Sequence, residues 1–173
     1  MRDELVEATH NRDPLTGARN RTSLLADLRE QQALVRRGVQ HCALAMIDVD
    51  RFKEINDRYG HVAGDAVLAS TSQCLQLQVR SYDRLYRYGG EEFLLCMPNT
   101  GIDAALEIAE RLRIAVAAQQ IRSGDSDPHL QITASFGIAA LDGERPVEES
   151  IDRVDKAMYQ AKTAGRNRVE VIT

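Results

Sequence analysis

The stretch Ala43-Leu44-Ala45-Met46-Ile47-Asp48-Val49-Asp50 decides the fold. Its first five residues are continuously apolar, which predicts a short strand buried on both faces of a sheet. The strand ends in carboxylates, and a buried charge costs several kcal/mol unless it is paired or bound to a cation. Mg²⁺ is one solution, because this ion takes one or two carboxylates together with water or substrate phosphates. Capping of a helix that begins near Arg51 is the other.

A second pattern lies further along the chain, where two apolar runs, Leu85–Tyr88 and Phe93–Met97, flank Gly89-Gly90-Glu91-Glu92. Two such runs around paired glycines predict a β-hairpin, with the glycines supplying positive φ at its tip. Neighbouring side chains in a strand point to opposite faces, so one glutamate is expected to face Asp48. A solvated acidic tip is the alternative.

The remaining elements follow from apolar periodicity. Helices are expected at 20–35 with Gly38 as its C-cap, from about residue 51, at 65–77, at 105–116 and at 151–161 with Gly165 at its close. A turn is expected at 123–128, and further strands at 132–140 and 168–172. Interleaved strands and helices with one hairpin predict an α/β or α+β sheet of mixed strand direction, covered by helices.

Composition narrows the function classes. The chain has 173 residues, 43% of them hydrophobic, which excludes a disulfide-stapled miniprotein and a disordered tail. A net charge of −4 argues against nucleic-acid or membrane binding driven by bulk charge. No apolar run approaches the roughly 18 residues of a membrane span. The three cysteines are scattered in apolar stretches, which favours reduced thiols and a cytoplasmic protein, and the scattered histidines disfavour a zinc site.

Three further motifs carry candidate chemistry. Asn56 and Asp65 flank a glycine-punctuated turn, where a carboxylate and an amide can together read a guanine edge; a helix N-cap at Asp65 is the alternative. Lys162 and Arg166 lie four residues apart, so both can reach a triphosphate, unless they only complement a helix macrodipole. The sequence Arg80-Ser81-Tyr82-Asp83, taken alone, is explained by a surface ion pair.

Together these segments resemble one family. In chain order they are Asp13-Pro14-Leu15-Thr16-Gly17-Ala18-Arg19-Asn20-Arg21, then Asp48-Val49-Asp50-Arg51-Phe52-Lys53-Glu54-Ile55-Asn56-Asp57, then Gly60-His61 and Gly64-Asp65, then Arg87-Tyr88-Gly89-Gly90-Glu91-Glu92-Phe93, and Ala161-Lys162 through Asn167-Arg168. Their order and spacing are similar to those of the GGDEF domain of bacterial diguanylate cyclases. Glu91 stands where the family name has Asp, which keeps the carboxylate, and Ala18 stands where Leu is common.

The resemblance implies a fold similar to class III nucleotide cyclases and the polymerase palm, with a central, mostly antiparallel five-stranded sheet surrounded by helices. The domain would occupy residues 13–173, preceded by an N-terminal linker helix at 1–12 and a sensory domain upstream. It would be cytoplasmic, although the full-length protein could be tethered to a membrane. Neither nucleic-acid binding nor membrane insertion of this segment is expected.

The implied reaction joins two GTP into cyclic di-GMP and releases two pyrophosphates, with one GTP per domain and catalysis in a homodimer. Mg²⁺ (or Mn²⁺) would be held by Asp48, the Val49 carbonyl and Glu91. Glu91 would also help to deprotonate the 3′-hydroxyl, and Glu92 is the second acid of the signature, with a less defined catalytic role.

The remaining site residues follow from the same resemblance. The guanine would be read by Asn56 and Asp65. The terminal phosphates would meet the backbone N–H groups of Arg51, Phe52 and Lys53 and the side chains of Lys162 and Arg166. Arg80 and Asp83 would form the inhibitory site for cyclic di-GMP, because an Arg-x-x-Asp stands at the family's spacing before the signature.

Two other functions are weighed against this one. A catalytically silent relative that senses cyclic di-GMP or GTP usually lacks the signature residues, which are all present here. A class III adenylyl cyclase is disfavoured by Asn56, Asp65 and the Gly-Gly-Glu-Glu-Phe hairpin.

Overall fold

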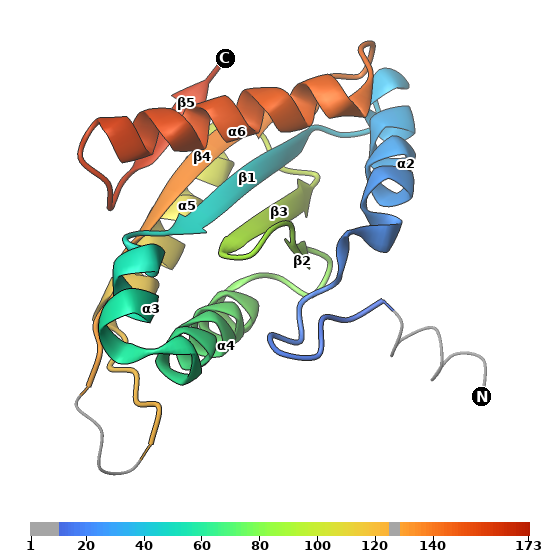
Figure 1. Ribbon diagram of the computed structural model, residues 1–173. Helices are drawn as coiled ribbons and strands as arrows, with labels where there is room; N and C mark the ends of the chain where they lie inside the picture. The colour runs from blue at the N-terminus through green and yellow to red at the C-terminus, as the bar shows by residue number, and fades with distance from the viewer. Residues whose placement is uncertain (1–10, 125–128) are drawn as a thin grey trace, which may run out of the picture.

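The computed structural model describes residues 11–124 and 129–173, which form a five-stranded sheet with helices on both faces (Figure 1). The strands are β1 (Cys42–Val49), β2 (Arg84–Arg87), β3 (Glu92–Pro98), β4 (Ala134–Ala140) and β5 (Val169–Ile172), in the spatial order β2-β3-β1-β4-β5. The pairs β2–β3, β3–β1 and β1–β4 are antiparallel, and β4–β5 is parallel. The expected mostly antiparallel five-stranded sheet is confirmed.

The central strand is β1, and every one of its residues is buried. Because it pairs with β3 on one side and β4 on the other, its end is fixed from both directions. Asp48 lies opposite Glu92 in β3 and opposite Ser135 in β4. The apolar run therefore forms the strand buried on both faces that the sequence predicts, and it delivers a carboxylate to the middle of the sheet edge.

Helices cover both faces of the sheet. They are α2 (Leu24–Arg36), preceded by the 3₁₀ turn η1 (Arg21–Ser23), then α3 (Phe52–Tyr59), α4 (His61–Gln78), α5 (Ile102–Ala118) and α6 (Val147–Thr163). Apolar residues of α4 and α5 share one core with the sheet, and those of α2 and α6 share the other. Gly38, with φ of +71°, follows the end of α2 as expected.

Alternation along β1 feeds both cores. Ala45 and Ile47 belong to the core shared with α4 and α5, whereas Leu44 and Met46 belong to the one shared with α2 and α6. On the second face α6 lies directly on β4, since a Cβ at Gly137 would come within 2.1 Å of the backbone nitrogen of Met158. This close approach brings the C-terminal end of α6 beside the end of β1.

The chain before α2 forms a small hairpin, which we call the N-terminal hairpin (residues 11–20). Arg12 and Arg19 form an antiparallel bridge, and Arg19 also bridges Tyr86 of β2. The expected linker helix at 1–12 lies outside the described residues except for Asn11 and Arg12, which are not helical. Of the expected turn at 123–128, only residues 123 and 124 are described, and both are bends. Within the described ranges, every helix is too short or too polar to cross a bilayer.

Candidate functional site

Four acidic side chains gather where β1 ends and the β2–β3 hairpin turns. Asp48 and Asp50 are only 7% and 4% exposed, and Glu91 and Glu92 are half-buried. The backbone N–H of Val49 donates to the carbonyl of Glu91 at 3.2 Å, so the hairpin turn is fixed against the end of β1. Glu91 precedes β3, so strand alternation does not set its direction; Glu92 lies directly beside Asp48 in the sheet.

Lys162, from the last turn of α6, provides the positive charge at this cluster. Its Nζ lies 2.5 Å from Asp48 Oδ1, 3.1 Å from Asp50 Oδ1 and 3.3 Å from the Val49 carbonyl oxygen. Three oxygen ligands around one cation are the kind of donor set that Mg²⁺ prefers. In the described parts of the chain no three His, Cys, Asp or Glu side chains group closely enough to hold an ion by themselves, so a metal here would also use the Val49 carbonyl.

Burial and mutual repulsion perturb the acids of the cluster. Burial raises the pKa of Asp48 to about 6, with repulsion from Glu91 and Asp50 adding to it and Lys162 opposing it. Burial likewise raises the pKa of Glu92 to about 7, reinforced by Asp48, Asp155 and Glu91. A site of this kind favours an added cation, because the cation relieves the repulsion and keeps the carboxylates charged.

Asp50 has a different role from the one that its position before α3 suggests. Its carboxylate accepts hydrogen bonds from Thr133 Oγ1 and Ser135 Oγ, both at 2.7 Å, and from the backbone N–H of Asn167 at 3.0 Å. Although burial acts to raise its pKa, these hydroxyl bonds and Lys162 lower it. The capping alternative is therefore wrong for Asp50, which ties β1 to β4 and to the turn after α6.

The first turn of α3 has no side-chain cap, and its N-cap residue Arg51 has φ of +57°. Arg51 and Lys53 are exposed there, and the Arg51 guanidinium lies 3.3 Å from Glu54. Arg166 lies in the turn after α6 with φ of +65°, and its side chain forms no hydrogen bond or ion pair with the described residues. Free N–H groups at a helix start, with cations nearby, suit a phosphate.

The two residues expected to read a base lie on adjacent helices. Asn56 is on α3, and its Oδ1 is buried without a hydrogen-bond partner in the described structure. Gly64 on α4 allows this side chain to lie where it does, because a Cβ there would be 1.9 Å from Asn56 Oδ1. Asp65 is exposed and lies inside α4, which begins at His61, so the N-cap alternative is wrong. A buried acceptor without a donor fits an N–H of a ligand.

The glycines of the hairpin turn do not supply the positive φ that the sequence predicts. Neither Gly89 nor Gly90 has a positive φ, and an added Cβ at Gly90 would meet no heavy atom within 4 Å. The turn is instead held by Arg87, whose Nη2 donates to the Gly90 carbonyl at 2.9 Å. The other terminal nitrogen of Arg87 donates to both carboxylate oxygens of Asp13 at 3.1 Å. No local sequence pattern predicts this link, because the two residues lie 74 positions apart in the chain.

Arg80 and Asp83 form a partly buried ion pair at the opposite end of β2 from the hairpin turn. The Asp83 side chain is 0% exposed and receives Nε of Arg80 at 3.0 Å and Nη2 at 2.8 Å. Arg80 also donates to Thr100 Oγ1 at 2.5 Å and lies over the Tyr82 ring. The expected ion pair is therefore present, and its carboxylate is buried while the guanidinium is about a third exposed and has further contacts to Thr100 and Tyr82.

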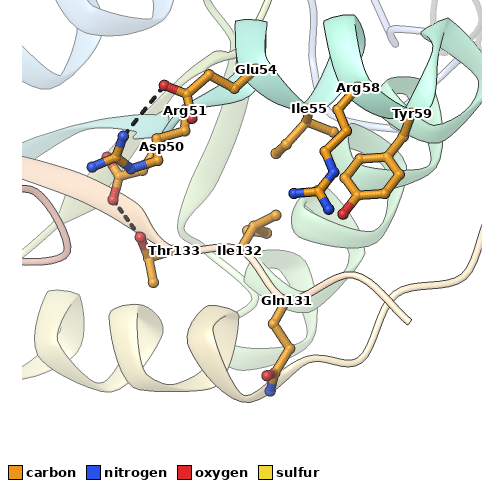
Figure 2. Close-up of a pocket in the computed structure, with 9 residues that line it drawn as sticks. All are labelled: Asp50, Arg51, Glu54, Ile55, Arg58, Tyr59, Gln131, Ile132 and Thr133. Carbon is orange, nitrogen blue, oxygen red and sulfur yellow. Dashed lines mark hydrogen bonds and ion pairs between the residues drawn. The ribbon is translucent and has the colours of Figure 1, made fainter. Parts of the chain in front are cut away.

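A cavity of about 240 Å³ lies between α3 and the segment before β4 (Figure 2). Its walls include Arg51, Arg58, Tyr59 and Gln131, with Ile55 and Ile132 between them. It borders the carboxylate cluster only through Asp50, which Figure 2 shows bonded to Thr133. No local sequence pattern predicts this cavity, because its lining residues come from segments far apart in the chain.

Comparison with known proteins gives concordant results. A family model described as "Diguanylate cyclase, GGDEF domain" matches residues 10–168. Diguanylate cyclase DgcP of Pseudomonas aeruginosa is 43% identical over 159 residues, which are 92% of this chain and 23% of that protein. Diguanylate cyclase DgcM of Escherichia coli is 40% identical over 98% of this chain and 40% of that protein. The chain thus spans less than half the length of these curated relatives.

The fold is also similar to those of solved GGDEF-type domains. The coiled coil and GGDEF domain of DgcB from Caulobacter crescentus, in complex with c-di-GMP, superposes with a TM-score of 0.92 at 27% identity, covering 99% of this chain and 90% of that one. The active GGEEF domain of a diguanylate cyclase from Vibrio cholerae superposes with a TM-score of 0.80 at 34% identity, covering 89% and 97%.

Proposed function

The chain belongs to the GGDEF family of diguanylate cyclases, a family of nucleotidyltransferases, and on that basis we propose that it joins two GTP into cyclic di-GMP and releases two pyrophosphates. The observation that carries the proposal is the meeting of Asp48, the Val49 carbonyl and Lys162 beside the Gly-Gly-Glu-Glu turn. This arrangement can hold a cation and polyphosphate at one place.

A divalent cation fits this site. Asp48, the Val49 carbonyl and Glu91 would hold Mg²⁺ or Mn²⁺, and the Lys162 ammonium already lies against two of these ligands as a cation would. The ion would supply charge neutralisation on the phosphoryl oxygens, which is what phosphoryl transfer chiefly requires.

The remaining contacts to GTP come from α3, α4 and the end of α6. Asn56 and Asp65 would bind the guanine, with the unpartnered Asn56 Oδ1 accepting one of its N–H groups. The backbone N–H groups of Arg51, Phe52 and Lys53 would donate to the terminal phosphates, because the first turn of α3 has no side-chain cap. Lys162 and Arg166 would add positive charge there. The backbone N–H groups are fixed by the helix before substrate arrives, so they stabilise phosphoryl charge without reorganisation.

Glu91 and Glu92 are the proposed catalytic carboxylates of the phosphoryl transfer. Glu91, half-buried in the hairpin turn, would accept the proton of the attacking 3′-hydroxyl, while Glu92 lies beside Asp48 in the sheet. The attacking hydroxyl would come from GTP on a second copy, so that each domain binds one GTP and catalysis needs a homodimer. Activity should therefore rise more than linearly with protein concentration.

We also propose an inhibitory site for the product and a place for this domain in a longer protein. Arg80 and Asp83 would bind cyclic di-GMP and inhibit synthesis, because the planar Arg80 fork is already oriented by a buried carboxylate. The catalytic domain would comprise residues 13–173, with 1–12 linking it to a sensory domain upstream. We place it in the cytoplasm, whether or not the whole protein is tethered to a membrane.

The decisive experiment is incubation of the 173-residue chain with GTP and Mg²⁺, followed by chromatography for cyclic di-GMP. We expect product from the wild-type chain and none from Asp48→Asn. GTP binding without product, at high protein concentration and in a dimerising fusion, would instead indicate a nucleotide sensor without catalysis.

A further inference from the structure

A second charged cavity lies between the N-terminal hairpin and the start of β2. It has a volume of about 200 Å³, and we call it the arginine pocket, because Arg12, Arg19, Arg80 and Arg84 all line it. Asp83 is the one acidic residue among its lining residues. Four guanidinium groups around so small a space are costly unless acids or a bound anion balance them.

In the described structure, nearby carboxylates form ion pairs with only two of these four arginines. Arg80 is paired with Asp83, and Arg84 Nη1 lies 3.2 Å from Asp27. Arg12 and Arg19 have no ion pair with any residue in the described ranges; Arg12 donates only to the Gly17 carbonyl, at 3.2 Å. Burial and the nearby Arg19 lower the pKa of Arg12, consistent with a cation held close to a like charge.

The backbone holds these two arginines on the same side of the hairpin. They are bridge partners, and like charges directly opposite each other across a strand pair destabilise it. The hairpin is nevertheless fixed to β2, because the Arg19 N–H donates to the Leu85 carbonyl at 2.9 Å and the Arg87 N–H donates to the Arg19 carbonyl at 2.7 Å. These main-chain bonds fix the hairpin beside β2, where Arg12 and Arg19 line the same cavity as Arg80.

We propose that Arg12 and Arg19 bind a phosphodiester of the cyclic di-GMP that Arg80 and Asp83 hold, so that the N-terminal hairpin forms one wall of the product site. This inference rests on the proposed function, since it extends the inhibitory site of the same cyclase. Arginine suits the task because its fork donates two parallel hydrogen bonds to phosphate oxygens. A long nucleic acid is disfavoured, because the charges converge on one small cavity while the chain as a whole is acidic.

The N-terminal hairpin would respond to bound product. Arg12 is near the start of the described chain, and Arg19 is fixed to β2, so a bound phosphodiester would hold the hairpin and Arg80 together. Product would then act on the part of the domain that directly follows residues 1–10.

The test is calorimetric titration of the whole chain with cyclic di-GMP in the absence of GTP. The variants are Arg19→Gln, the double variant Arg12→Gln with Arg19→Gln, and Arg80→Ala. The matched control is Arg145→Gln, an exposed arginine paired with Glu149 on α6. We expect roughly tenfold weaker binding per arginine removed, a shallower dependence of affinity on salt in the double variant, and unchanged binding in the control. Arg19→Lys, which keeps the charge but loses the fork, should fall between wild type and Arg19→Gln.

Two results separate this inference from the function on which it rests. Wild-type affinity in the double variant, together with lost binding in Arg80→Ala, would overturn the role of Arg12 and Arg19 while keeping the product site. Unchanged affinity in Arg80→Ala would instead overturn the product site itself. Pyrophosphate alone is the second titrant, and binding as tight as that of cyclic di-GMP, weakened in the double variant, would show that the pocket is a site for free polyphosphate.

Discussion

The Lys162 ammonium lies 2.5 Å from the Asp48 carboxylate, although 114 positions separate the two residues in the chain (162 minus 48). Both side chains are largely shielded from water, at 20% and 10% exposure, and Asp50 contacts the same ammonium. One cation from α6 thus compensates two carboxylates at the end of β1. The folded chain depends on this compensation, and so does the site where we place the metal and phosphates.

Replacing Lys162 with Met should leave Asp48 and Asp50 uncompensated. We expect the free energy of unfolding to fall by about 3 kcal/mol, as for other buried pairs that lose one partner. Chemical denaturation measures this loss, and Lys156→Met, an exposed lysine on the same helix, is the control. Mg²⁺ should restore part of the stability of Lys162→Met, because a ligand that binds only the folded state stabilises it. Equal losses in the two variants would contradict the role of Lys162.

Replacing Glu91 with Gln should abolish synthesis. The substitution keeps the shape of the side chain but removes both a proposed metal ligand and a proton acceptor, each of which contributes at least about 10²-fold. The initial rate of cyclic di-GMP formation, followed by chromatography at saturating GTP, is the measurement. Glu144→Gln, at an exposed position, should retain wild-type activity. Residual activity above about a tenth of wild type would rule out both assigned roles.

Gly64→Ala should weaken GTP binding while preserving the helix. Alanine inside a helix is normally stabilising by up to about 1 kcal/mol relative to glycine. Here, however, the new Cβ would lie 1.9 Å from Asn56 Oδ1 and would displace that side chain. We expect the KM for GTP to rise at least tenfold, with the helical circular dichroism signal retained. Gln73→Ala, on the exposed side of α4, should leave the KM unchanged. An unchanged KM in Gly64→Ala would mean that Asn56 does not contact the base.

Asp13→Asn should destabilise the fold in a pH-dependent way. Burial acts to raise the pKa of Asp13, but hydrogen bonds from Thr16 and the charge of Arg87 outweigh it, so the folded pKa is lowered. The stabilisation by the charged form is therefore complete above the ordinary Asp pKa of about 4 and disappears as the pH falls through the lower folded value. We expect a difference of about 1–2 kcal/mol between wild type and variant at pH 7. Denaturation at pH 7 and pH 3 checks it, and a difference that grows on acidification would contradict the assignment.

Local sequence patterns predicted the elements well but not how they meet. The apolar run before Asp48 and the glycine-flanked hairpin were correct because strand burial and turn chemistry are local properties. The start of α4 was placed four residues late, since Gly60, with φ of +89°, lets α3 and α4 follow each other almost directly. The prediction of a positive φ at Gly89 and Gly90 was wrong.

Local sequence patterns predicted only some of the contacts in the functional site. The sequence pattern identified Asp48 as a buried acid in need of a cation, but that cation comes from the far end of α6. The bonds from Thr133 and Ser135 that make Asp50 a structural tie, rather than a helix cap, exist only after β4 pairs with β1. Such partners are set by tertiary packing, which no local pattern encodes.

Arg87 donates hydrogen bonds from Nη1 to the Asp13 carboxylate and from Nη2 to the Gly90 carbonyl. A single guanidinium therefore joins the first described turn of the chain to the turn that carries Glu91. A displacement of the residues ahead of Asp13 would reach that turn through two noncovalent links, without repacking either core. The position of the turn that carries Glu91 is therefore coupled to the position of Asp13, a residue that neither lines the acidic cluster nor belongs to the sheet.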